Sequence, residues 1–208
     1  MAILNPAVRH GFPGGTFRAC RQRRLRTVPH GSIWMLLSCA IAMGSLSDLQ
    51  PQTPPPGEYE VKAAFLYNFA KFVEWPPGAF PDPNSPLIIG VVGEDPFGEA
   101  LDFAVAGKLV QGRPLEVRRW RRFENVDSCH ILFFSSSDRR TLPESLRQLG
   151  SLPVLTVGEP EEFIEAGGVL RFLLENNRVR FDINNLNAKK AGLKISSRLL
   201  ALASHVWE

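Results

Sequence analysis

The strongest pattern of apolar and polar positions lies over Glu58–Pro77, EYEVKAAFLYNFAKFVEWPP. Its apolar residues recur at spacings of four, four and three, as on one face of a helix: Val61, Phe65, Phe69 and Phe72. Trp75 and the proline pair after it end the predicted helix, because proline cannot continue a helix and favours extended geometry in the residue before it. A helix this apolar needs a large apolar surface to lie on, so the rest of the chain must supply one.

Strands and helices alternate after this helix. Three short apolar runs are typical of strands buried on both faces: LIIGVV from residue 87, CHILFFS from residue 129 and PVLTV from residue 153. Arg113–Trp120 alternates in the way of a more exposed strand. Helices are predicted between these runs, over residues 96–106, 138–149 and 161–166. This order predicts a mainly parallel sheet with helices on both faces.

The pattern changes after residue 168. VLRFLL and RVRFDI are separated by Glu175-Asn176-Asn177, which predicts a β-hairpin. Two helical pieces follow, broken near Gly192, and the second has an apolar stripe: Leu199, Leu200, Leu202, Ala203 and Val206. The predicted fold class is α/β, a three-layer α/β/α sandwich with a mainly parallel sheet plus one antiparallel hairpin strand. The helix over residues 58–75 and the C-terminal helices are expected to cover one face together.

The charge of the chain is unevenly placed. A formal net charge of +3 and a pI of about 8.9 suggest nucleic-acid binding. Residues 1–57 hold six arginines against one aspartate, however, whereas the remainder holds 18 basic and 20 acidic residues. The predicted globular part is close to neutral, so no nucleic-acid partner is expected.

The basic N-terminal segment has the layout of a secretory signal. An arginine-rich region ends at Arg26, an apolar region runs from about Ile33 to Ile41, and Ala42-Met43-Gly44 offers the small residues of a cleavage site. The predicted division is a signal peptide over 1–44, a proline-rich linker over 45–57 and one domain over 58–208. Two alternatives are an uncleaved anchor and a lipoprotein modified at Cys39, because Leu36-Leu37-Ser38-Cys39 resembles a lipobox.

Candidate chemistry after the linker is sparse. Cys129 is the one cysteine left there, and in its apolar run it is expected to be buried and inert. His130 cannot serve as its base, because strand neighbours point to opposite faces. His205 has no potential metal ligand at i±4 on its predicted helix. We predict no catalytic residue, no metal site and no cofactor, and therefore no enzyme.

Two charged segments are candidate partner-binding surfaces. The first is the run that surrounds Trp120: Arg118, Arg119, Arg121 and Arg122. It is either a charged strand end or a contact for an anionic partner. The second is the strand RVRFDIN, whose alternation places Arg178, Arg180 and Asp182 on one face. This face is either solvated or the polar rim of an interface around Trp75, a rigid aromatic anchor beside two prolines.

The loops at the carboxyl ends of the parallel strands form a third candidate. Residues 93–98, 135–138 and 158–160 should gather at that edge, where open α/β sheets bind ligands. These loops are acidic and rich in capping residues, which gives them little to hold an anion.

Eight segments in this order make the chain similar to the YfiR family of periplasmic proteins: YEVKAAFLYNFAKFVEWP, LIIGVVGEDPFG, KLVQGRPLEVRR, CHILFFSSS, VLTVGE, AGGVLRF, RVRFDIN and AGLKISSRLLALA. The resemblance implies an α/β fold, often dimeric, and a periplasmic repressor that binds the periplasmic domain of a membrane-bound diguanylate cyclase. Such repressors lower cyclic di-GMP and biofilm formation, and an outer-membrane lipoprotein can sequester them. Some members carry cysteine pairs, whereas only Cys129 remains here. The alternative function is a periplasmic small-ligand-binding or sensor module without a cyclase partner.

Overall fold

The computed structural model of the protein describes residues 57–124, 126 and 128–208. The predicted signal peptide, its cleavage site, Cys39 and all of the linker except Gly57 lie outside these residues. Over the described ranges, no helix combines the length and the apolar character that crossing a bilayer requires.

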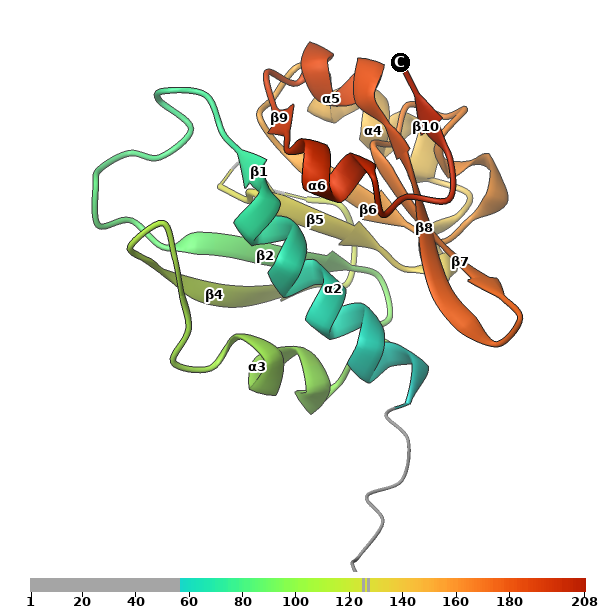
Figure 1. Ribbon diagram of the computed structural model, residues 1–208, viewed down its shortest axis with the longest axis horizontal. Coiled ribbons are helices and arrows are strands. Elements are labelled where there is room, and N and C mark those ends of the chain that lie inside the picture. Colours follow the sequence, from blue (N-terminus) through green and yellow to red (C-terminus); the bar gives the residue numbers. More distant parts are fainter. Residues whose placement is uncertain (1–56, 125, 127) are drawn as a thin grey trace, which may run out of the picture. The chain divides into compact units, whose positions relative to one another are not determined.

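The centre of the domain is an eight-stranded sheet, shown in Figure 1. Its strands are β2 (Leu87–Val92), β3 (Leu109–Val110), β4 (Arg113–Trp120), β5 (Ile131–Phe134), β6 (Leu155–Gly158), β7 (Leu170–Glu175), β8 (Arg178–Asn184) and β10 (Val206–Trp207). Their order is β10-β8-β7-β6-β5-β2-β4-β3. The five strands from β7 to β4 are mutually parallel, and β8 pairs antiparallel with β7. The predicted fold class, with its antiparallel hairpin, is confirmed.

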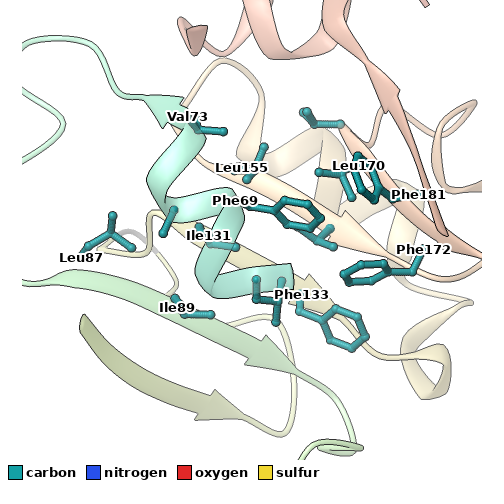
Figure 2. Packing of buried hydrophobic residues seen from close by; sticks show 14 of the residues in the cluster. Phe69, Val73, Leu87, Ile89, Ile131, Phe133, Leu155, Leu170, Phe172 and Phe181 are labelled. Atoms are coloured by element: carbon teal, nitrogen blue, oxygen red, sulfur yellow. The ribbon is translucent and has the colours of Figure 1, made fainter. Parts of the chain in front are cut away.

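One face of the sheet, which we call the α2 face, is covered by four helices: α2 (Glu58–Phe72), α3 (Glu99–Val105), α5 (Asn185–Lys190) and α6 (Ser197–Leu200). Phe69 of α2 is fully buried; its ring stacks on Phe172 with centroids 5.6 Å apart and meets Phe181 edge-on at 5.2 Å. Figure 2 shows these rings gathered with Ile131 and Phe133 of β5 and Leu155 of β6. The apolar stripe of the sequence therefore lies on the sheet surface it requires.

The other face, the α4 face, is covered by α4 (Leu142–Leu149) and by irregular segments that include a 3₁₀ turn over Glu161–Phe163. Alternation along β5 supplies both faces at once. Ile131 and Phe133 point to the α2 face, whereas Leu132 and Phe134 point to the α4 face. The sheet is thus the middle layer of three, as predicted.

Helix boundaries differ from the sequence prediction. α2 ends at Phe72, and the next two residues form strand β1 (Val73–Glu74), which pairs with β9 (Lys194–Ile195). α3 begins at Glu99 because Asp95 Oδ1 accepts from the N–H of Phe97, at 2.8 Å, and holds a turn there. α4 begins at Leu142 instead of residue 138, and the predicted helix over 161–166 is only the short 3₁₀ turn.

The second C-terminal helix is the largest error of the prediction. α6 has four residues, and the chain then turns and adds β10 to the sheet beside β8, so Val206 is in a strand. The N–H of Ile183 donates to the carbonyl oxygen of His205 at 2.9 Å, so His205 is not helical. An open sheet edge offers unpaired backbone groups, and pairing with them outweighs the helical pattern of the sequence.

Candidate functional site

The predicted loops gather at the carboxyl edge of the sheet. The N–H of Glu94 donates to Ser137 Oγ at 3.0 Å, and Ser136 Oγ donates to Glu159 Oε2 at 2.9 Å. Three loops that are far apart in the sequence are therefore cross-linked by hydrogen bonds between their own groups. Because these polar groups bond to one another, the edge is better suited to a rigid surface than to an open ligand site.

Lys62 of α2 completes this edge, and the sequence analysis missed it. Its side chain is almost fully buried, Nζ lies 2.7 Å from Glu159 Oε1 and pairs with Glu58, and it sits 4.5 Å from the centre of the Tyr59 ring. Burial opposes its charge, but the hydrogen bonds that Lys62 donates to Glu159 and Glu58 prevail and raise the pKa of Lys62 above its ordinary value. A charged lysine held by two carboxylates ties α2 to the sheet edge. Its place on the apolar stripe, four residues before Leu66, was the available signal.

The arginine run around Trp120 is divided by the structure instead of forming one patch. Arg119 donates to Asp95 and Asp102, at 2.6 Å each, and so joins β4 to the start of α3. Arg118 points to the opposite face, where it donates to Glu116 at 2.9 Å and to Ser128 Oγ at 3.2 Å. Arg121 and Arg122 follow the end of β4 and are exposed. The predicted single basic cluster therefore separates into three environments.

Trp75 is half-buried and held by internal contacts. Its Nε1–H donates to the carbonyl oxygen of His130 at 3.3 Å, and its ring meets Phe80 and His130 edge-on, with centroids 6.3 and 6.2 Å away. His130 precedes β5, so Trp75 lies at the amino edge of the sheet. Arg178 and Arg180 lie at the start of β8, beside the hairpin turn and thus at the carboxyl edge. The structure does not bring Trp75 and these arginines together.

The charged face of β8 is only partly exposed. Phe181 and Ile183 are buried on the α2 face, as the alternation predicts, and Arg180 is exposed, 3.8 Å from Glu175. Asp182, in contrast, is 3% exposed and lies 2.5 Å from the guanidinium of Arg171 on β7. The prediction that Asp182 contributes to a polar rim is corrected, because its carboxylate is buried in a cross-strand ion pair with Arg171.

A stack of side chains braces the loop that precedes β2. The ring of Phe80 stacks on the ring of His130, with centroids 4.2 Å apart. The guanidinium carbon of Arg113 lies over the Phe80 ring, 3.8 Å from its centroid. Arg113 also donates to the carbonyl oxygens of Asp82 and Ser85, at 2.9 and 2.8 Å. The loop is therefore fixed against the amino edge of the sheet.

Both nitrogens of His130 are used in this arrangement. Nδ1 accepts from the N–H of Ile88 at 3.1 Å, and Nε2 donates to the carbonyl oxygen of Ala79 at 3.2 Å. Burial lowers the pKa of His130 below its ordinary value, and the nearby cations Arg113 and Arg118 act in the same direction. His130 is thus a neutral structural residue.

A cavity of about 430 Å³ opens beside this stack, at the amino edge of the sheet on the α4 face. Cys129 lies in its wall and is buried, as predicted, and burial raises the pKa of its thiol to about 12. A thiol with this pKa stays protonated at neutral pH and is a poor nucleophile. Within the described ranges, no three or more His, Cys, Asp and Glu side chains are grouped so that they could hold a metal ion.

Comparison with known proteins identifies the family. The sequence profile of the YfiR/HmsC-like family matches residues 59–204, which is most of the chain and nearly all of its described part. The protein belongs to the YfiR/HmsC-like family. This family is regulatory and not catalytic, and membership confirms the resemblance drawn from the eight sequence segments.

Two solved proteins align with the chain at low sequence identity. No curated protein matches the chain. A conserved domain protein from Vibrio cholerae aligns with 72% of this chain and 60% of its own, at 13% identity and a TM-score of 0.47. An ABC domain in complex with L-Trp from Streptococcus pneumoniae aligns with 58% of this chain and 55% of its own, at 12% identity and a TM-score of 0.43. The chain thus spans less than two thirds of either solved protein.

Proposed function

We propose that the protein is a periplasmic regulatory binding protein that represses a membrane-bound diguanylate cyclase and so lowers cyclic di-GMP and biofilm formation. The observation that carries the proposal is the family match over residues 59–204. The buried charges Lys62 and Asp182 are paired within the fold, so a partner would meet other, exposed side chains.

The partner would meet a surface of the hairpin. Arg178 and Arg180 are exposed there on one face, and Leu174, which is 52% exposed, lies on the other. The hairpin thus carries charged side chains on one face and an apolar side chain on the other. Together they can supply the apolar contact and the polar rim of an interface. We expect Arg180→Glu to weaken partner binding at least tenfold, about 1.4 kcal/mol, without unfolding the domain. Trp75 lies at the opposite edge of the sheet, so Trp75→Ala should leave binding at the hairpin unchanged and should lower stability, because its contacts with His130 are lost.

The cellular test measures cyclic di-GMP. Deleting the gene should raise the nucleotide, and the same deletion in a strain whose partner cyclase carries an inactive catalytic domain should have no effect. The purified protein should also bind the periplasmic domain of that cyclase, with Arg198→Glu, an exposed arginine on α6 outside both candidate surfaces, as the control. If deletion of the gene left cyclic di-GMP unchanged, and the purified protein bound the periplasmic domain of no membrane-bound cyclase of the host, the proposal would be contradicted.

Export is a separate part of the proposal. A signal cleaved after Gly44 would leave mature protein that begins at Ser45 and is released by osmotic shock. N-terminal sequencing decides this, because an intact Met1 in the cytosol would exclude a periplasmic regulator. A lipid on Cys39 would instead place the protein at a membrane surface.

The second candidate function is a periplasmic small-ligand-binding or sensor module without a cyclase partner, and the cavity at the amino edge favours it. Neighbouring genes separate the two candidates. A gene for a membrane protein with a GGDEF domain favours the repressor, whereas a transporter or TonB-type receptor favours the ligand module. The repressor proposal also includes sequestration by an outer-membrane lipoprotein and formation of a homodimer. Both would be tested with the same purified protein.

A further inference from the structure

The cavity at the amino edge has the size and lining of a small-molecule site. Its volume of about 430 Å³ falls in the range of roughly 300–1,000 Å³ that is common for such sites. Its apolar wall comes from Ile88, Leu152 and Val154, which belong to β2 and to the segment that leads into β6. Leu152 is 45% exposed, so part of this apolar surface faces the open side of the cavity.

The opposite wall is the braced loop. Ala79, Pro81 and Ser85 line the cavity from this loop. The contacts of Arg113 with the carbonyl oxygens of Asp82 and Ser85, and the stacked pair of Phe80 and His130, hold the loop in place. Ligand sites are usually preformed, and a wall held by this many contacts meets that condition.

The polar groups of the cavity determine the charge of its occupant. Among the described residues that line the cavity, Arg118 carries the one charged side chain, and none is Asp or Glu. The carboxylate of Glu116, which is not among the lining residues, forms an exposed ion pair with Arg118 Nε at 2.9 Å, and Ser128 Oγ accepts from Nη1. A guanidinium carries five N–H donors, so others remain. The remaining donors can meet an anionic group, and a planar guanidinium matches a carboxylate with two parallel hydrogen bonds. The two nitrogens of His130 are already occupied and add no charge.

We propose that this cavity binds a small organic anion, with its apolar body against Ile88, Leu152 and Val154 and its anionic group on Arg118. The inference rests on the cavity and not on the proposed repressor function. It deepens the second candidate function, the small-ligand-binding module, by naming the chemical class of the ligand. The cavity and the hairpin lie at opposite edges of the sheet, so each can be disrupted separately.

The test is a fluorescence titration with 8-anilinonaphthalene-1-sulfonate, an apolar dye with one anionic group. The purified protein should bind one equivalent saturably, and benzoate should displace it whereas benzyl alcohol should not. Arg118→Gln is expected to raise the dissociation constant at least tenfold. Ser128→Trp, at an exposed lining position, fills the cavity and should abolish displaceable binding. Arg122→Gln makes the same charge change outside the cavity and should leave the constant unchanged.

Each outcome decides for or against the site. Circular dichroism first establishes that the variants are folded, and Ser128→Trp remains informative if Arg118→Gln does not fold. Dye binding that both cavity variants leave unchanged would place the dye elsewhere and overturn the inference. Equal weakening by Arg118→Gln and Arg122→Gln, or equal displacement by benzoate and benzyl alcohol, would also overturn it. Capture of the cyclase domain is measured apart from these titrations, so failure of one proposal leaves the other standing.

Discussion

The two faces of the sheet draw on alternate residues of the same strands, yet they are covered very unequally. Among the described residues, 25 buried hydrophobic side chains form the cluster on the α2 face and 11 form the cluster on the α4 face. Four helices cover the first, whereas α4 is the one α-helix packed in the second. Burial of apolar area is the main favourable term of folding, so the α2 face should dominate stability.

The thinner α4 face is completed by close packing of a different kind. The Phe163 ring lies directly over Gly158 and Gly168; a Cβ on either glycine would fall within 2.4 Å of the ring. At its amino end the same face is left open, and the cavity lined by Cys129 and Arg118 lies there. One face therefore stabilises the domain, and the other leaves room for an accessible site. Four predictions test this division, beginning with the largest effect.

Phe69→Ala should lower the free energy of unfolding by about 3–5 kcal/mol, because it removes a fully buried ring and leaves a cavity between Phe172 and Phe181. Urea denaturation followed by circular dichroism measures the change. Phe103→Ala is the matched control, since Phe103 is 73% exposed on α3 and should change stability by less than about 0.5 kcal/mol. Similar losses in the two variants would mean that the α2 face does not carry the stability assigned to it.

Gly158→Ala should cost roughly 2 kcal/mol, although it adds only one methyl group. The new Cβ would overlap the Phe163 ring, which is fully buried and cannot move away without opening the α4 face. Gly57→Ala is the control, because no atom lies within 4 Å of a Cβ at that position. Thermal unfolding of both variants compares them, and wild-type stability of the Gly158 variant would show that Phe163 can shift freely.

Local patterns of the sequence predicted the sheet correctly where several residues agreed. Buried runs such as LIIGVV must face two apolar layers, and the two asparagines of the hairpin turn adopt positive φ of 49° and 60°, as such a turn requires. Strand β10 could not be predicted, because Val206 also fits the apolar stripe of a helix and a strand of two residues has no pattern of its own. The chain end forms a strand here because the edge of β8 lies beside it and offers unpaired backbone groups, and that position follows from the tertiary fold alone.

The candidate site was less predictable than the fold, because its contacts join distant parts of the chain. Alternation placed Asp182 on the correct face, but its burial depends on Arg171 of the neighbouring strand. Trp75 was expected to be an interface anchor from its proline neighbours alone, and its partner is a carbonyl group 55 residues away. The cavity itself has no sequence pattern, since its walls come from four separate segments.

Cys129→Ala should cost on the order of 1 kcal/mol, because the buried sulfur packs within the smaller cluster. In the native protein, burial raises the pKa of the Cys129 thiol to about 12, so almost no thiolate is present at pH 8. A thiol-specific chromogenic disulfide should therefore react with the unfolded protein and hardly at all with the folded one. Rapid reaction under native conditions would show that the α4 face opens far more readily than its packing indicates.

His130 should give the smallest effect, one that appears only in acid. The pKa of His130 is lowered in the folded protein, whereas in the unfolded chain it is near its ordinary value of about 6.5. The unfolded state therefore binds the proton more readily, and the stability that neutral His130 contributes is present above about pH 6.5 and is lost as pH falls through the folded pKa. His130→Asn can still accept from the N–H of Ile88 but cannot titrate in this range. We expect the wild type to lose more stability than this variant between pH 7.5 and 5.0, measured by urea denaturation at both values. Equal losses would show that His130 takes up its proton without disturbing the amino edge, and the braced wall of the cavity would then tolerate a charge that its geometry is expected to reject.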